Sequence, residues 1–172
     1  MPLCLHFPKS NATVFSDTTT DVVGVEIGGA LKNPLAIGAG AAAGLGFGQS
    51  TLALLVTRGC REMRLLSVKL GGSAETLAGL SGVGDLMLTC FSSLSRNNRF
   101  GRAIASGKTT EEAIEEIGEV VEGFPTSREA VLLAERAGLG RKDLPLYHAI
   151  ADVLQCVARI FVLFRCWLHF LN

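Results

Sequence analysis

The chain has 172 residues, of which 48% are hydrophobic, so it is long enough to form one domain with its own core. Sixteen basic residues balance sixteen acidic ones, and the formal net charge at pH 7 is zero. This balance, with no basic stripe interleaved with aromatic residues, argues against nucleic acid and anionic membrane surfaces as partners.

The first 20 residues, MPLCLHFPKSNATVFSDTTT, are polar and rich in serine and threonine. Within them, ATVF favours a short strand at 12–15, and the remainder predicts irregular structure. The segment has no basic region followed by an apolar one, so we predict no signal peptide. We therefore expect an irregular N-terminal segment over residues 1–20.

The cysteines form no C-x-x-C pair and no cluster with histidine at the spacing of zinc ligands; they are Cys4, Cys60, Cys90, Cys156 and Cys166. We therefore expect no metal site. An odd, scattered set in a chain of this size indicates reduced thiols in a reducing compartment. Cys60 and Cys90 are interpreted as small core residues.

From Asp21 the pattern becomes helical. Asp21 is a candidate N-cap for VVGVEIGGALKNPLAIGAGAAAG, which is apolar nearly all round and predicts a central, buried helix. Pro34 removes one helical hydrogen bond and clashes with the preceding turn, so we expect a kink there. A loop, GLGFG, is expected to follow.

The next elements are predicted from caps and glycines. Ser50 is the predicted cap of an amphipathic helix that ends at Gly71 and Gly72. The stretch 73–93 predicts two short helices divided by Gly82 and Gly84, and SRNNRFG opens another short helix.

Two capping boxes are predicted further along, Thr109 with Glu112 and Thr126 with Glu129, the second helix ending at Gly138. DLPLYHAIADVLQ begins a last helix. Because no convincing strand follows residue 20, the prediction is an all-α domain of about seven helices.

The end of the chain is apolar from Val153 to Leu171, near the length of a membrane span. Arg159 and Arg165 argue against a free span, because arginine at mid-membrane costs roughly 2.5 to 3.5 kcal/mol. A helix packed on a partner is the favoured interpretation, and a tail without selected structure stays open.

One charged side chain, Lys32, stands inside the apolar run GGALKNPLAIGAG. A buried lysine is costly to desolvate, so either its stem reaches solvent or the site needs its charge. The sequence leaves two interpretations open. Lys32 and Asn33 are a solvent-reaching pair, or they present a cation and an amide at a dry, close-packed site.

Two further motifs carry possible chemistry. Asp85 and Thr89 are four residues apart and share one helix face, although Asp85 is equally a simple N-cap. Arg96 and Asn97 fall near a helix start, where free N–H groups and a bidentate guanidinium favour an anion. The alternative there is a solvated basic turn.

The order of the motifs is more specific than any one of them. GVEIGGALKNPLAIGAG, GLGFG, LVTRG, SGVGDLMLTC, SRNNRFG and VVEG, in that order and at those separations, resemble the NAD(P)-dependent glycerol-3-phosphate dehydrogenases. The resemblance covers residues 21–154. It implies an all-α, multi-helix C-terminal domain of the 6-phosphogluconate-dehydrogenase-like type, with residues 155–172 as a divergent tail.

The resemblance implies roles for individual residues. Lys32 corresponds to the family's catalytic lysine, and the positions near the reacting centre are Asn33, Asp85 and Thr89. The substrate-phosphate loop corresponds to Ser95, Arg96 and Asn97. The cofactor, NAD or NADP, is expected to touch Arg96, Val120 and Glu122.

Three features depart from the family pattern. No G-x-G-x-x-G fingerprint opens this chain, so the half that grips the dinucleotide is expected to be missing. Pro34 stands where the family usually has an aliphatic residue, and its kink could move Lys32. The apolar tail is unlike the family's polar C-terminal helix. The missing first half and the unfamiliar tail suggest an incomplete or alternatively spliced gene product.

The resemblance implies interconversion of glycerol 3-phosphate and dihydroxyacetone phosphate in the cytoplasm, or in a plastid if a transit peptide precedes this sequence. A homodimer is a possible assembly. The alternative is a catalytically inactive helical fragment that serves as a dimerisation or interaction module, which the apolar tail would favour.

Overall fold

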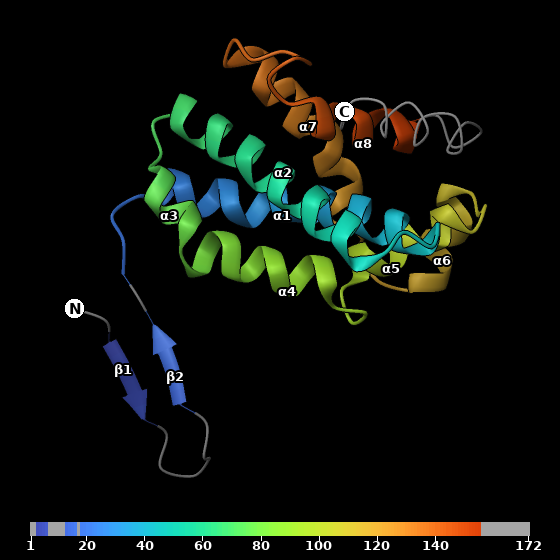
Figure 1. Cartoon of the computed structure of the whole chain (residues 1–172), viewed down its shortest axis with the longest axis horizontal. Coiled ribbons are helices and arrows are strands. Elements are labelled where there is room, and N and C mark those ends of the chain that lie inside the picture. Colours follow the sequence, from blue (N-terminus) through green and yellow to red (C-terminus); the bar gives the residue numbers. More distant parts are fainter. Residues whose placement is uncertain (1–2, 7–12, 17, 156–172) are drawn as a thin grey trace.

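The computed structural model describes residues 3–6, 13–16 and 18–155. After an N-terminal hairpin, the described chain is helical, which confirms the predicted all-α class (Figure 1). Its elements are α1 (Val22–Gly44), α2 (Gln49–Lys69), α3 (Ala74–Ala78), the π-helical segment η1 (Leu80–Gly84), α4 (Asp85–Phe91), α5 (Arg96–Ala105), α6 (Thr110–Ile117), α7 (Gly123–Arg136) and α8 (Pro145–Gln155).

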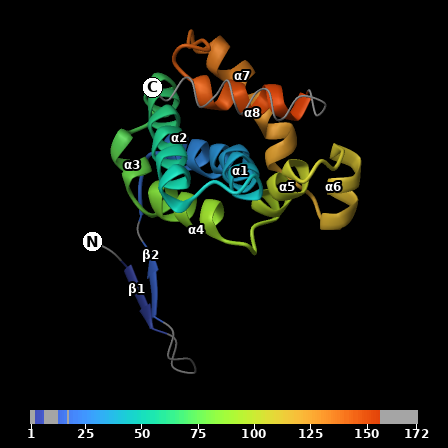
Figure 2. The same ribbon diagram turned by 45° about the vertical axis from the view of Figure 1, so that its right-hand side comes forward.

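The N-terminal segment is a two-stranded hairpin. β1 (Leu3–His6) pairs antiparallel with β2 (Thr13–Ser16), with Leu3 opposite Ser16. The strand expected at 12–15 is confirmed within one residue, whereas the expectation of irregular structure over the rest of residues 1–20 was wrong at β1. A four-residue strand gives too short an alternation to stand out. The hairpin points away from the helices in both views (Figures 1 and 2).

Helix α1 forms the centre of the domain. Figure 2 looks nearly along its axis and shows the other helices arranged around it. Asp21 caps it as predicted, since its carboxylate accepts the Gly24 N–H at 2.9 Å. The helix continues through Pro34 to Gly44. Every residue from 31 to 42 is buried except Lys32. This part of α1 is therefore packed on all sides, as its almost wholly apolar sequence predicted.

The glycines of α1 allow its backbone to touch that of α5. A Cβ atom on Gly40 would lie 2.0 Å from the carbonyl oxygen of Asn98. On the other helix, a Cβ atom on Gly101 would lie 2.1 Å from the carbonyl oxygen of Ile37. Neither contact leaves room for a methyl group, so the crossing of α1 and α5 depends on a glycine from each helix.

Two predicted caps were wrong. Helix α2 begins at Gln49 after the extended Gly48, so Ser50 lies inside its first turn. Helix α7 begins at Gly123, and the Thr126 hydroxyl donates to the Glu122 carbonyl at 2.7 Å from within the helix. In both cases the helix begins before the predicted cap, at an N-cap residue whose side chain makes no capping hydrogen bond: Gly48 for α2 and Glu122 for α7.

The two short helices predicted over residues 73–93 are α3 and α4, and Gly82 and Gly84 lie between them as predicted, although in a π-helical segment and not in a loop. Both glycines lie in η1, which leads directly into α4, while α3 precedes it. A Cβ atom on Gly82 would lie 2.0 Å from the Leu77 carbonyl oxygen, so glycine here permits the wide π-helical turn to pack on α3.

Other predicted boundaries are confirmed. Thr109 and Glu112 form a reciprocal capping box at α6, and Gly71 and Gly138 follow α2 and α7 with positive φ angles. No helix among residues 18–155 is long and apolar enough to cross a membrane. Residues 156–172 of the predicted tail lie outside the described residues, so the expectations for the tail stay predictions.

The α1–α5 crossing predicts opposite effects for two glycine substitutions. Gly101→Ala should lower the free energy of unfolding by about 1–3 kcal/mol, because the new methyl group overlaps the α1 backbone. Gly29→Ala is the matched control. It meets no atom within 4 Å and should raise stability by up to about 1 kcal/mol through helix propensity. Urea unfolding measures both, and equal stability of the two variants would contradict the crossing.

Candidate active site

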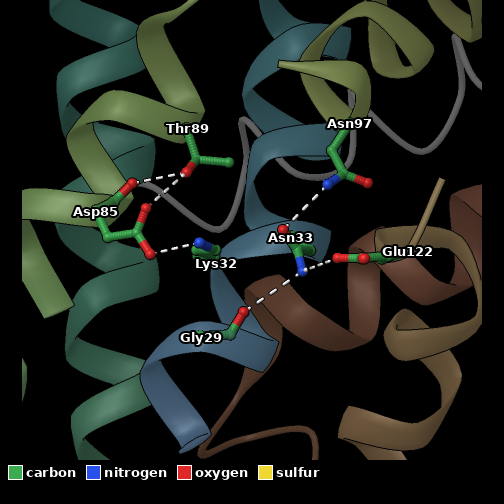
Figure 3. Close-up of polar contacts among 7 residues, drawn as sticks. All are labelled: Gly29, Lys32, Asn33, Asp85, Thr89, Asn97 and Glu122. Atoms are coloured by element: carbon green, nitrogen blue, oxygen red, sulfur yellow. Dashed lines mark hydrogen bonds and ion pairs between the residues drawn. The ribbon is translucent and has the colours of Figure 1, made fainter. Parts of the chain in front are cut away.

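Lys32 is the one residue between 31 and 42 of α1 that is not fully buried. Its ammonium donates to Oδ2 of Asp85, the first residue of α4 (Figure 3). The side chains are 23% and 33% exposed, so the ion pair lies at the edge of the core. Of the two interpretations left open, the structure therefore favours a paired cation at a packed site over a lysine reaching freely into water.

Asp85 is not an N-cap, which had been the simpler alternative. The N-cap of α4 is Gly84, and no side chain caps this helix. The Asp85 carboxylate instead faces Lys32 and lies 3.3 Å from the Thr89 hydroxyl, which donates to the Asp85 carbonyl at 2.7 Å. The predicted shared face of Asp85 and Thr89 is confirmed.

Asn33 joins α1 to two other helices (Figure 3). Its Oδ1 accepts from Asn97 of α5 at 3.0 Å, and its Nδ2 lies 3.3 Å from the Glu122 carboxylate and 3.4 Å from the Gly29 carbonyl oxygen. The Oδ1 of Asn97 accepts the Gly123 N–H at 2.9 Å. Because Asn33 and Asn97 are both 7% exposed, these amide bonds are shielded from water.

The first turn of α5 presents a cation beside a helix N-terminus. Ser95 caps the helix, and its hydroxyl accepts the Asn98 N–H at 3.3 Å. Arg96 is the first residue of α5, is 41% exposed and pairs with Glu119 at 3.4 Å. Unpaired N–H groups, the helix dipole and a guanidinium together favour an anion at this position.

These groups line one open cleft of about 410 Å³. Seven of the nine predicted site residues contribute to it: Lys32, Asn33, Thr89, Ser95, Arg96, Asn97 and Glu122. Asp85 does not line the cleft itself but forms an ion pair with Lys32, which does. Val120 does not line the cleft either, and it is 72% exposed. The remaining lining residues were not predicted; they are Leu88, Ser92 and Leu94.

The sequence pattern gave little indication of the site residues that were not predicted. Ser92 and Leu94 stand in the loop between α4 and α5, where no periodicity identifies a facing side chain. Glu119 was also missed, and only the fold brings it to Arg96. No group of three or more His, Cys, Asp and Glu is placed to hold a metal within the described ranges.

Other parts of the molecule offer less chemistry. Burial raises the pKa of the Cys90 thiol to about 12, so this neighbour of Thr89 stays protonated and behaves as a core residue, as predicted. An apolar pocket beside α8, lined by Leu55, Ile104, Leu146 and other aliphatic or small residues, contains no titratable side chain.

The fold and the cleft together define a helical domain in which a lysine–aspartate pair, two buried amides and a helix N-terminus lie close to one cleft. The chain belongs to the family of the NAD-dependent glycerol-3-phosphate dehydrogenase C-terminus, whose model matches residues 21–160.

Relatives of known name support this assignment. The chain is 47% identical over 137 residues to the NAD(P)+ glycerol-3-phosphate dehydrogenase of Haemophilus ducreyi, covering 80% of this chain and 40% of that one. With the enzyme of the same name from Aromatoleum aromaticum, identity is 51% over 150 residues, covering 87% and 44%. The chain thus spans less than half the length of these relatives.

A solved structure shows the same fold. The crystal structure of glycerol-3-phosphate dehydrogenase from Coxiella burnetii matches with a TM-score of 0.74 and 39% identity, over 84% of this chain and 46% of that one.

The hydrogen bond between the Asn97 and Asn33 side chains predicts that replacing Asn97 with aspartate lowers stability in a pH-dependent way. Asn97→Asp places a carboxylate against Asn33 Oδ1, where the amide now donates, and should cost about 1–3 kcal/mol near pH 7. Lowering the pH should recover part of this loss, because the introduced carboxyl can donate once protonated. Arg96→Ala, next to it but exposed, should stay within about 0.5 kcal/mol of the parent. Urea unfolding at several pH values tests this, and a pH-independent loss would contradict it.

Proposed function

We propose that this chain supplies the substrate-binding and proton-donating residues of an NAD- or NADP-dependent glycerol-3-phosphate dehydrogenase. The observation that carries the proposal is Lys32, the one residue of 31–42 that is not buried, which pairs with Asp85 beside a cleft that also contains Arg96. Membership of the family supports it. The proposed unit spans residues 21–154, with residues 155–172 as a separate tail.

The cleft contains the charges that ketone reduction needs. Reduction of dihydroxyacetone phosphate places negative charge on the carbonyl oxygen, and the Lys32 ammonium stabilises that charge and donates the proton. Asp85 keeps the ammonium at the cleft edge, and Thr89 fixes the carboxylate in turn. In the reverse direction the neutral amine of Lys32 accepts the alcohol proton.

The phosphate of the substrate is assigned to the start of α5. Arg96 and Asn97 line the cleft there, and the N-terminal turn of the helix adds N–H donors. We assign Asn33, which lines the cleft beside Lys32, to a contact with a substrate hydroxyl, which would exchange one of its present amide hydrogen bonds. A molecule with a phosphate at one end and a carbonyl near its middle matches this order of groups.

The residues that face a dinucleotide form only one side of a binding site. Arg96 and Glu122 line the cleft and fit a contact with the cofactor, whereas Val120 lies away from the lining. No G-x-G-x-x-G sequence follows a predicted strand in these 172 residues. When bound, the nicotinamide supplies the hydride, and the residues of this chain supply position and charge.

A second candidate function is an interaction module. Six apolar side chains of the η1–α4 region and the loop after it are exposed: Leu80, Val83, Met87, Leu88, Phe91 and Leu94. Exposed apolar side chains gathered in one stretch of the chain favour a protein contact, including a homodimer. The free thiols of Cys60 and Cys90 support the proposed location in a reducing compartment, the cytoplasm.

Phosphate binding tests the anion site. Inorganic phosphate should bind weakly to the parent chain, and Arg96→Ala should weaken it at least about tenfold, because a charge-assisted hydrogen bond contributes about 1.5–3 kcal/mol. Glu119→Gln should tighten binding by up to about fivefold, because it frees Arg96 from an exposed ion pair. Arg141→Ala is the control, since Arg141 forms a similar pair with Asp152 and does not line the cleft. Equal affinities of all four proteins in an NMR titration would exclude the site.

Turnover tests the role of Lys32. The chain alone should oxidise NADH with dihydroxyacetone phosphate below roughly 1 s⁻¹, whereas fusion behind the N-terminal half of the Haemophilus ducreyi enzyme should restore activity. In the fusion, Lys32→Ala should lower kcat by at least about 10²-fold with a smaller change in KM. Lys108→Ala removes an exposed lysine paired with Glu116 and should leave kcat unchanged.

Pro34→Val in the same fusion tests whether the expected kink displaces Lys32, in which case its activity rises. If Lys32→Ala keeps the kcat of its parent, Lys32 is a structural lysine and the proposed mechanism is wrong.

A further inference from the structure

Three consecutive residues of α1 are each held by a different part of the domain. The Leu31 carbonyl oxygen accepts from the Tyr147 hydroxyl of α8 at 3.0 Å. Lys32 pairs with Asp85 of α4, and Asn33 bonds to Asn97 of α5. The contacts of Lys32 and Asn33 belong to the cleft already described, whereas the Tyr147 contact belongs to no part of it.

Tyr147 is itself rigidly placed. It is 0% exposed, and it lies in the first turn of α8. The backbone N–H groups of Leu146 and Tyr147 donate to the Glu62 carboxylate of α2 at 3.0 and 3.3 Å. A carboxylate at a helix N-terminus is favoured by the helix dipole, so Glu62 fixes the start of α8.

Glu62 is an unusual residue for this purpose, because it is also 0% exposed. Burial raises the pKa of Glu62, while the hydrogen bonds from Arg58 and the α8 backbone oppose that shift. The Arg58 Nε donates to Glu62 Oε1 at 3.0 Å. A buried carboxylate held by a cation and two backbone donors is a stiff anchor for the helix that carries Tyr147.

The Tyr147 hydroxyl meets α1 in the turn that precedes Pro34. Pro34 lies inside α1 and has no N–H, so the Ala30 carbonyl lacks its usual helical donor. The carbonyl that Tyr147 binds, that of Leu31, is the next along this turn, immediately before Lys32. The hydroxyl therefore restrains the backbone of the segment that determines where the Lys32 side chain begins.

We propose that Tyr147 is a positioning residue for Lys32. Its hydrogen bond to the Leu31 carbonyl holds the Pro34-containing turn of α1 in the position that brings the Lys32 ammonium to Asp85. Glu62 acts one step further back by fixing the first turn of α8. This inference rests on the proposed function of Lys32 for its catalytic meaning, but the geometry that it concerns is measurable without turnover.

The test follows the Lys32 side chain by NMR in chains labelled with ¹³C-lysine, the Lys32 signal being assigned from Lys32→Arg. Tyr147→Phe keeps the ring and removes only the hydroxyl. Its Lys32 Cε–Hε signal should broaden and shift toward the position that it takes in Asp85→Asn, where the ion pair is absent. The Lys108 signal, from a lysine paired with Glu116, should not move.

Ser127→Ala is the matched control, because Ser127 is buried and its hydroxyl also donates to a helix carbonyl, that of Phe124, at 2.7 Å. It should lower stability without moving the Lys32 signal. A folded Tyr147→Phe whose Lys32 signal stays at the parent position overturns the proposal, as does an equal shift in Ser127→Ala.

Glu62→Gln keeps the proposal falsifiable if Tyr147→Phe does not fold. It retains an acceptor oxygen for α8 and weakens the bond to Arg58, so it should shift the Lys32 signal in the same direction by a smaller amount. An unmoved signal in this variant overturns the proposal. Failure of the proposed function is distinct, since it appears as unchanged kcat for Lys32→Ala in the fusion whatever the NMR result.

Discussion

The backbone contact between α1 and α5 is the constraint on which the cleft depends. Gly40 and Gly101 let the two helices cross without intervening side chains. This crossing sets the separation of the two chemical groups of the cleft, the Lys32–Asn33 pair on α1 and the Arg96–Asn97 pair on α5. The glycines that weaken each helix locally therefore allow the two parts of the cleft to be held at a fixed distance.

The charge of Lys32 is tolerated in the buried part of α1 because its ammonium is paired with the Asp85 carboxylate. Lys32 lies between residues that are packed on every side, and its ammonium reaches a carboxylate at the boundary with solvent. Partial exposure reduces the desolvation cost that a fully buried pair would carry. The same partial exposure leaves the Lys32 side chain in the lining of the cleft, as the proposed proton donation requires.

Local patterns predicted much of this architecture. Asp21 and the Thr109–Glu112 box were predicted as helix caps and are confirmed. The resemblance carried by the motif order implied that Lys32, Asp85 and Arg96 lie near one site. Long-range contacts could not be predicted in this way. The carboxylate of Glu62 binds the start of α8, 84 residues further on, and Glu119 meets Arg96 only because the fold brings them together. The predictions for Ser50 and Thr126 were wrong because the N-caps of α2 and α7, Gly48 and Glu122, make no side-chain capping hydrogen bond that a sequence pattern would indicate.

A crystal of this chain soaked with glycerol 3-phosphate would test whether Lys32 and Arg96 bind opposite ends of one substrate, because the structure shows where each end of the molecule lies. We predict that the phosphate contacts Arg96 and the first turn of α5, and that the C2 hydroxyl lies within hydrogen-bond distance of the Lys32 ammonium. A molecule bound in the opposite direction, with its phosphate on Lys32, or bound outside this cleft, would contradict the account.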